Sequence, residues 1–316
     1  MLTEAEFMLA QMANPYSHYS HKVDPNVCFD FIQSNKISLL LKRNGLIIKQ
    51  AEEDEKNLSR LLNELVEIKK IFDSQDVKFV LIKLPKLPRP HGDLDILLIK
   101  NINSAEDILK KKGYAIVNDA DPYRRTYIKE INGERLEVDF HLEAAWGGIV
   151  YLEKEEIWNN RVVRKINDVD IPVPCPEHEL LITAAHGMRE NKITLFDVLY
   201  VAHIFSENEI NMEFVRAVAK ENNWLNQLQC FVSVINEIYY SLYGSPITEN
   251  PIPNFKFGNI KRLKIDLPFN LPFYISFKLK SQKMFSDLIH FGVGNAVHDL
   301  RSYYSDISVF LRGVRK

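Results

Sequence analysis

Residues 77–100 read VKFVLIKLPKLPRPHGDLDILLIK, and the fold is organised around this stretch. Two apolar runs are joined by a short connection that holds three prolines, which predicts two neighbouring strands. Asp93 and Asp95 interrupt the second run. A buried strand rarely carries such groups, because an unpaired buried anion costs much free energy. The two aspartates therefore indicate a functional site within the strand.

Carboxylates gather on one face of this strand and of a second one. Side chains alternate along a strand, so Asp93 and Asp95 project from the same side. By the same alternation, residues 136–142 (LEVDFHL) place Glu137, Asp139 and His141 on one face. If the two strands are neighbours, Asp139 adds a third carboxylate to the pair. Like charges this close need a cation, and three oxygen donors suit Mg²⁺ or Mn²⁺ better than zinc.

Composition limits the class of protein. With 316 residues, 46% of them apolar, the chain can form two domains, or one core with helical additions. The 40 Lys and Arg nearly balance 42 Asp and Glu, giving a net charge of -2, so there is no strong nucleic-acid-binding signature, although a local basic patch stays open. The cysteines Cys28, Cys175 and Cys230 have neither disulfide-framework nor zinc-site spacing.

The sequence gives no membrane signal. The start of the chain lacks a basic segment followed by an apolar block, and no apolar run is long enough to span a bilayer. We therefore expect a soluble, cytoplasmic protein with no membrane partner.

The chain before the carboxylate strands has helical patterns. Thr3 and Glu6 have capping-box spacing, and a second helix is predicted to begin at Asp24. Apolar residues recur at helical spacing over 37–72, where Gly45 can divide the segment into two helices.

The central segment predicts a small mixed sheet. Its elements are a strand at 77–84, the Asp93 strand, a helix at 104–112 with Ser104 as N-cap and Gly113 after its C-terminus, strands at 114–117 and 125–131, and a strand at 134–142. The dipeptide Asn132-Gly133 predicts a hairpin between the last two strands. A further hairpin at 161–173 turns at Asn167-Asp168.

Beyond Pro176 the pattern becomes helical. We expect helices at 177–188, 195–205, 212–222 and 225–243, a Pro-rich covering loop at 250–273, and a last helical region at 280–312. The fold class is thus α+β. A small mixed β-sheet core at 76–174 is flanked by an N-terminal helical region at 1–75 and a C-terminal helical domain at 175–316.

Four features in order resemble the nucleotidyltransferases of the DNA polymerase β superfamily. They are Lys83 at a strand end, Arg89 in the connection, Gly92-Asp93-Leu94-Asp95 before an apolar run, and Val138-Asp139-Phe140-His141. The chain is most similar to the poorly characterised bacterial and archaeal branch with a C-terminal helical domain. Residues 176–181, Ala185-His186 and 196–198 resemble that domain.

The resemblance implies transfer of a nucleoside monophosphate from an NTP such as ATP to an acceptor hydroxyl, with release of pyrophosphate. Asp93 and Asp95 would hold the Mg²⁺ (or Mn²⁺) bound to the triphosphate, and Asp139 would share a second ion and help to activate the acceptor. Lys83 and Arg89, with Gly92 beside them, would lie on the phosphate side. The acceptor stays open among a small molecule, a protein hydroxyl and an RNA end.

One departure bears on activity. The superfamily's Gly-Ser turn is replaced by Lys83-Leu84-Pro85-Lys86, and proline provides no amide donor for phosphate. The phosphate contacts must come from side chains, or are weakened or lost. A non-catalytic nucleotide-binding or interaction module on the same fold is therefore an alternative, and a metal hydrolase that uses His141 and His186 is a third.

Each candidate residue also has a structural interpretation. Asp93 can cap a turn at Gly92, and Asp139 and His141 can face solvent on an edge strand. An ordinary basic loop can account for Lys83, Lys86 and Arg89. His186 lies in an apolar helix, where a packed histidine is the commoner role.

The last prediction places the site between two parts of the chain. The helical domain after Pro176 is expected to cover the carboxylate rim, with His186, Arg189 and Lys192 on the helix that forms the far wall. Arg189 and Lys192 are three residues apart and would share a helix face. His141, His186 and Arg189 would then lie on the acceptor side.

Overall fold

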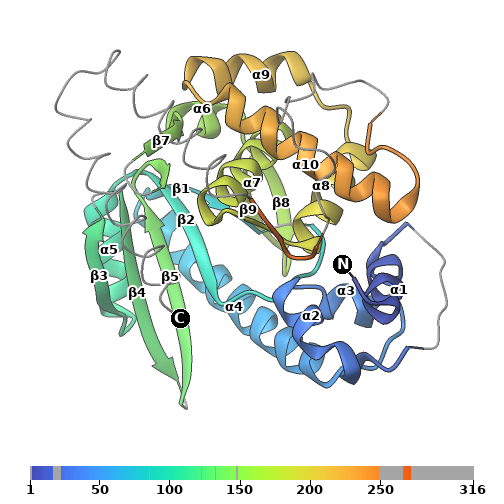
Figure 1. The fold of residues 1–316 in the computed structure, drawn as a ribbon. Coiled ribbons are helices and arrows are strands. Elements are labelled where there is room, and N and C mark those ends of the chain that lie inside the picture. Colours follow the sequence, from blue (N-terminus) through green and yellow to red (C-terminus); the bar gives the residue numbers. More distant parts are fainter. Residues whose placement is uncertain are drawn as a thin grey trace.

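The computed structural model describes residues 2–16, 23–84, 86–121, 123–131, 133–146, 149–248 and 266–271 (Figure 1). The N-terminal elements are α1 (Glu4–Ala13), the 3-10 helix η1 (Pro25–Cys28), α2 (Phe29–Ser34), α3 (Ser38–Arg43) and α4 (Lys49–Ser74). Most of the loop predicted at 250–273, and the helical region predicted at 280–312, lie outside the described residues.

Local sequence explains the N-terminal helices. The Thr3 amide donates to Glu6 Oε2 at 2.7 Å, and the Glu6 amide donates to Thr3 Oγ1 at 3.3 Å, which completes the capping box. Gly45 has φ +92, a left-handed conformation that suits glycine, and it separates α3 from α4. The predicted capping box at Thr3 and the predicted division of the helical segment at Gly45 are confirmed.

The carboxylate strands lie in a five-stranded mixed sheet. Its strands are β1 (Lys78–Ile82), β2 (Asp93–Lys100), β3 (Ala115–Asp121), β4 (Arg124–Ile131) and β5 (Glu134–His141), and the spatial order is β1-β2-β5-β4-β3. β2 and β5 pair in parallel, and the other neighbours pair antiparallel. The predicted mixed sheet and α+β fold class are confirmed.

The helix after β2 begins earlier than the sequence predicts. α5 spans Ile102–Lys111, so Ser104 lies inside the helix and is not its N-cap. The N-cap is Asn101, whose left-handed backbone (φ 62) is tolerated by asparagine and whose side chain donates to the Asp76 carbonyl at 2.8 Å. Gly113 has φ +86 just past the helix end, as predicted.

The sheet has two different faces. Leu94, Ile96 and Leu98 of β2 lie in one apolar cluster with Val138 and Phe140 of β5. Helices α4 and α5 cover this face with apolar side chains of the same cluster (Leu61, Leu65, Ile68, Phe72, Ala105, Ile108 and Leu109). The residues at alternate positions, which include the carboxylates, therefore project from the opposite face.

The rest of the chain adds two small hairpins and a helical group. The elements are β6 (Ala144–Trp146), β7 (Ile149–Leu152), α6 (Lys154–Asn159), β8 (Val162–Ile166), β9 (Val169–Val173), α7 (Pro176–Glu190), β10 (Lys192–Ile193), α8 (Leu195–Glu207), α9 (Met212–Glu221), α10 (Leu225–Tyr243) and β11 (Phe269–Asn270). Asn167 (φ 46) and Asp168 (φ 61) form the predicted β8–β9 turn.

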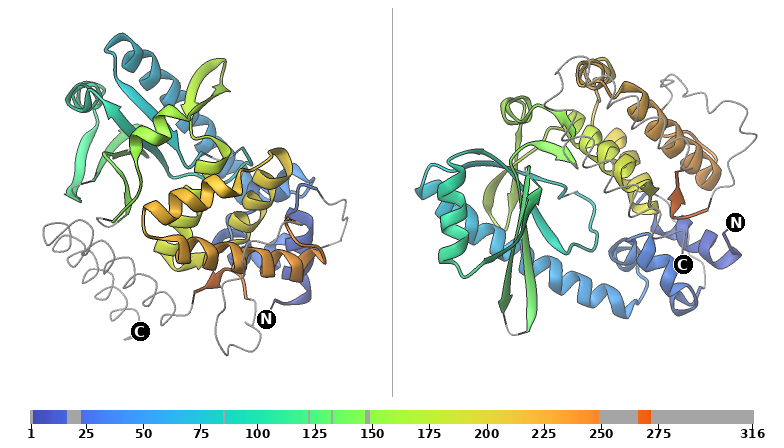
Figure 2. Two further views of the ribbon diagram at one scale, coloured as in Figure 1. Left: turned by 90° about the horizontal axis from the view of Figure 1, so that it is seen from above. Right: turned by 60° about the vertical axis from the view of Figure 1, so that its left-hand side comes forward.

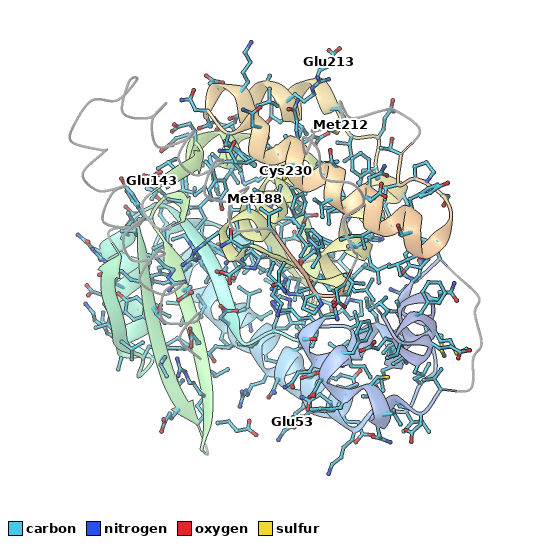
Figure 3. The ribbon with its side chains drawn as sticks, in the orientation of Figure 1. Glu53, Glu143, Met188, Met212, Glu213 and Cys230 are labelled. Carbon is cyan, nitrogen blue, oxygen red and sulfur yellow. The ribbon has the colours of Figure 1, made fainter. Side chains whose placement is uncertain are left out.

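The N-terminal helices α1–α3 pack with α7–α10 in one apolar cluster, while α4 extends from there to the sheet (Figure 2). Tyr243 Oη at the end of α10 donates to the Ala10 carbonyl at 2.8 Å. Figure 3 shows Met188 and Cys230 inside this helical group, Glu213 at its outer surface, and Glu53 on the exposed side of α4. Among the described residues, no helix combines the length and apolar character needed to cross a membrane.

Candidate functional site

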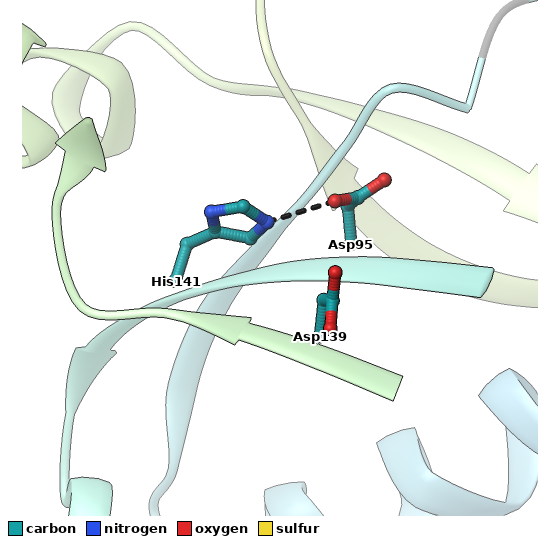
Figure 4. Close-up of side chains that lie close together, drawn as sticks. All are labelled: Asp95, Asp139 and His141. Atoms are coloured by element: carbon teal, nitrogen blue, oxygen red, sulfur yellow. Dashed lines mark hydrogen bonds and ion pairs between the residues drawn. The ribbon is translucent and has the colours of Figure 1, made fainter. Parts of the chain in front are cut away.

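Parallel pairing of β2 and β5 brings the predicted carboxylates together. Asp95 is the register partner of Asp139 (Figure 4), and Asp93 is the partner of Glu137. Ligand atoms of Asp93, Glu137 and Asp139 lie within 4.8 Å of one another, and so do those of Asp95, Asp139 and His141. Asp139 therefore belongs to two overlapping groups of potential metal ligands.

Asp95 is buried and fully compensated. Its Oδ1 accepts from Lys83 Nζ at 2.7 Å and lies 2.8 Å from His141 Nε2. Burial alone would raise the pKa of Asp95, but the Lys83 charge and the His141 hydrogen bond outweigh it and hold the pKa well below its usual value. Asp95 is thus ionised at neutral pH.

Asp139 is also buried, and β4 holds it in place. Thr126 Oγ1 donates to Asp139 Oδ1 at 2.5 Å, and Arg124 Nη1 lies 3.4 Å from Oδ2. Thr126 is the register partner of Asp139, so the antiparallel β4–β5 pairing positions this donor. These contacts fix the carboxylate that the two ligand groups share.

Asp93 has a different environment. Burial, and then the nearby Asp95 charge, raise its pKa to about 6. A divalent cation would remove this repulsion and favour the ionised carboxylate. The oxygen donors of Asp93, Glu137 and Asp139 are the type that Mg²⁺ and Mn²⁺ prefer, so the residues fit such an ion.

The carboxylates open into a cavity of about 310 Å³ between the sheet and the helical group. It is lined by Lys36, Lys83, Asp93, Arg124, Asp139, His186, Arg189, Glu190, Lys192, Thr194 and Asp197. The sheet, the end of α7 with the start of α8, and the segment after α2 each form one wall. The structure therefore brings Asp93 and Arg189 to one cavity, as the cleft prediction requires.

The far wall is not a single helix face. α7 ends at Glu190, Asn191 is left-handed (φ 52), and Lys192 begins β10. The prediction that Arg189 and Lys192 share a helix face is wrong. Both residues still line the cavity, one on each side of the left-handed residue Asn191.

The two histidines lie in different places. His141 is buried beside Asp95, at the carboxylates. His186 lines the cavity, where burial and then the Lys83 charge lower its pKa well below 6.5, so it is neutral at physiological pH. Of the three residues predicted on the acceptor side, His186 and Arg189 therefore line the wall opposite the sheet, whereas His141 belongs to the sheet.

Arg89 does not line the carboxylate cavity. Its guanidinium lies 5.6 Å from the Phe196 ring centroid, and it borders a second, mostly apolar cavity of about 300 Å³ with Lys86. Gly92 precedes β2, and a Cβ added there would meet no atom within 4 Å, so packing does not require glycine at this position.

Sequence patterns alone do not reveal two cations of this cavity. Arg124 is the register partner of His141 in the β4–β5 hairpin. Because Arg124 directly precedes the predicted strand at 125–131, extending that strand by one residue would have identified it. Lys36 lies far away in sequence, between two helices, and only tertiary packing brings it to the site.

A family model described as an uncharacterised nucleotidyltransferase matches residues 44–240. The antigenic nucleotidyltransferase-like protein from Paracoccidioides brasiliensis aligns over 58% of this chain and 90% of its own, with 12% identity and a TM-score of 0.39. The lincosamide antibiotic adenylyltransferase LnuA with bound lincomycin aligns over 46% of this chain and 97% of its own, with 16% identity and a TM-score of 0.31. No curated protein matches the chain.

Proposed function

The chain belongs to the uncharacterised nucleotidyltransferase family, and from this premise we propose that it moves a nucleoside monophosphate from an NTP to an acceptor hydroxyl. The observation that carries the proposal is the position of Asp139 in both groups of ligand atoms. One shared carboxylate supports a pair of adjacent divalent ions, which is the arrangement suited to in-line phosphoryl displacement.

Three aspartates would hold the metal. Asp93, Asp95 and Asp139 would bind Mg²⁺ or Mn²⁺, which supplies charge neutralisation of the triphosphate and activation of the acceptor oxygen. The acceptor oxygen forms a bond to the α-phosphorus, the bond from this phosphorus to pyrophosphate breaks, and the acceptor proton leaves to solvent or a nearby base. Asp139, held by Thr126 and Arg124, would orient the attacking side.

Side chains would replace the missing Gly-Ser turn on the phosphate side. Lys83 forms an ion pair with Asp95. It can neutralise this carboxylate in the free protein and contact the phosphates in the complex. His186 and Arg189 on the opposite wall would face the acceptor, whose identity we leave open. The unpaired cysteines fit a reducing compartment, and we propose the cytoplasm.

Nucleotide transfer tests the proposal directly. Wild-type protein is incubated with each labelled NTP, Mg²⁺ or Mn²⁺, and a panel of small-molecule, protein and RNA acceptors. We expect label transfer or slow pyrophosphate release, reduced at least a hundredfold in Asp139→Asn. The matched control is Asp73→Asn, because Asp73 pairs with Lys69 on the surface of α4. Failure to transfer label or release pyrophosphate under every condition would refute the proposal.

A non-catalytic nucleotide-binding or interaction module is the second candidate. The Lys83 ion pair favours it, because Asp95 is stabilised in the absence of metal. This alternative predicts NTP binding without turnover, and a cellular role that survives Asp139→Asn.

A further inference from the structure

Lys36 has a backbone conformation that usually favours glycine. It follows α2 with φ +57, its amide donates to the Gln33 carbonyl at 3.2 Å, and the Ile37 amide donates to the Ile32 carbonyl at 3.2 Å. These two bonds define a Schellman motif, in which the left-handed residue is commonly glycine. A lysine here carries a backbone cost that glycine would avoid, so its side chain is the feature to explain.

Asn35 fixes Lys36 against α8. Asn35 is fully buried, and its Oδ1 accepts from the Leu195 amide at 2.9 Å, while its carbonyl accepts from the Phe196 amide at 3.2 Å. These are two of the amides at the start of α8 that have no partner within the helix. The segment after α2 is therefore attached to the helix start that borders the carboxylate cavity.

Lys36 lines this cavity, and the carboxylates near it are those of Asp197 and Glu190. Among the described residues, no carboxylate lies within ion-pair distance of the Lys36 ammonium. The nearby Asp197 Oδ2 already accepts from the Thr194 amide at 2.8 Å and from Thr194 Oγ1 at 2.7 Å. Burial and the Arg89 charge lower the pKa of Lys36. An anionic ligand bound beside Lys36 would stabilise its charged form.

The other cations of the cavity differ in their partners. Lys83 lies against Asp95, and Arg124 lies near Asp139, so both partly offset the carboxylates. Lys36 and Lys192 line the same cavity. A polyphosphate chain that begins at the carboxylate-bound metal would bring several negative charges to these two lysines.

We propose that Lys36, with Lys192, binds the terminal phosphates of the NTP. This inference rests on the proposed function. It assigns a substrate contact to Lys36, which lies outside the family-matched segment 44–240. It also supplies phosphate contacts from lysine side chains, since the prolines in the connection before β2 have no amide to donate.

Binding of inorganic tripolyphosphate with Mg²⁺, measured by calorimetry, tests the inference without turnover. We expect Lys36→Gly to weaken binding at least tenfold while the melting temperature stays equal or rises, because glycine suits the left-handed position. Lys36→Arg should keep most of the affinity. Lys42→Met is the control, because Lys42 lies on α3 and pairs with Glu55 at 2.6 Å. Wild-type protein that does not bind tripolyphosphate, or Lys36→Gly that binds within twofold of wild type, overturns the inference.

Turnover separates this inference from the proposed function. If wild type transfers nucleotide, Lys36→Gly should raise KM for the NTP more than it lowers kcat. Transfer with an unchanged KM would leave the proposed function standing and overturn the inference. Lys36-dependent binding of tripolyphosphate in a protein that transfers nothing would support the phosphate site and refute the transferase proposal.

Discussion

Two aspartates on the same strand face have opposite protonation tendencies. Asp95 is ionised because Lys83 and His141 compensate its burial, whereas burial and the Asp95 charge raise the pKa of Asp93 to about 6. The difference arises from neighbours and not from residue type. One carboxylate is thus permanently charged, and the other becomes fully charged when a cation binds.

Buried His178 should make stability depend on pH. It is fully buried, its ring centroid lies 5.6 Å from that of Phe214, and burial lowers its pKa from 6.5 to about 4. Between these values the unfolded chain binds a proton that the folded protein does not bind, so stability is complete above pH 6.5 and falls as the pH decreases toward 4. The free energy of unfolding should fall by about 2 kcal/mol between pH 7 and 5 from this group.

Urea denaturation at pH 7 and pH 5 measures this effect, with His178→Gln as the comparison. The variant lacks the titrating imidazole, so its pH dependence over this range should be smaller by a similar amount. Identical pH dependence in both proteins would contradict the prediction.

At the scale of elements, α7 and α10 are in close contact at Gly187. A Cβ at this position would lie 2.7 Å from Phe231 Cε2, and Phe231 is fully buried. Alanine would gain about 1 kcal/mol of helix propensity, but overpacking of a closed core costs about 1–3 kcal/mol. We expect Gly187→Ala to lower the free energy of unfolding, measured by thermal or urea denaturation.

A second substitution gives a sharp control for this contact. Phe231→Leu removes the ring atoms nearest to the added methyl group. The double variant should therefore be less destabilised than the sum of the two single variants. Additive effects would show that the close helix approach is not the cause.

Sequence periodicity predicts most elements, because each depends on local spacing. The alternation that separates Leu94 from Asp93 and Asp95 identifies both strand faces, and Asn132-Gly133 identifies the hairpin that places Asp139. The two exceptions have different causes. At the start of α5, the tertiary contact from Asn101 to Asp76 accompanies the earlier N-cap, whereas α7 ends before Lys192 because Asn191 has a local left-handed backbone conformation.

At the scale of the molecule, three separate parts of the chain build the cavity. The sheet supplies the carboxylates, the end of α7 and the start of α8 supply the opposite wall, and Lys36 follows α2. The sequence does not predict this arrangement. Helical periodicity shows which face of a helix is buried, but it does not show that α1–α3 pack against α7–α10. The domain limits at 75 and 174 stay a proposal.

Hydrogen exchange should reveal the three walls together. With Mg²⁺ and an NTP bound, we expect slower amide exchange at residues 35–38, 93–97, 137–141 and 192–197, because a ligand in the cavity stabilises all its walls. The end of α10, residues 236–243, serves as the internal reference, because these residues do not line the cavity. Mass spectrometry of peptides can resolve these segments. Protection confined to the sheet would contradict the shared-cavity arrangement.

The parallel pairing of β2 with β5 also has a consequence for how the chain folds. α5, β3 and β4 all lie between the two strands in sequence, so Asp95 and Asp139 meet only after a long loop closes. The β4–β5 hairpin is local and can form first, whereas the strand pair that carries the carboxylates has high contact order and forms more slowly. An ion that needs both carboxylates binds after this step. It should therefore slow unfolding without accelerating refolding.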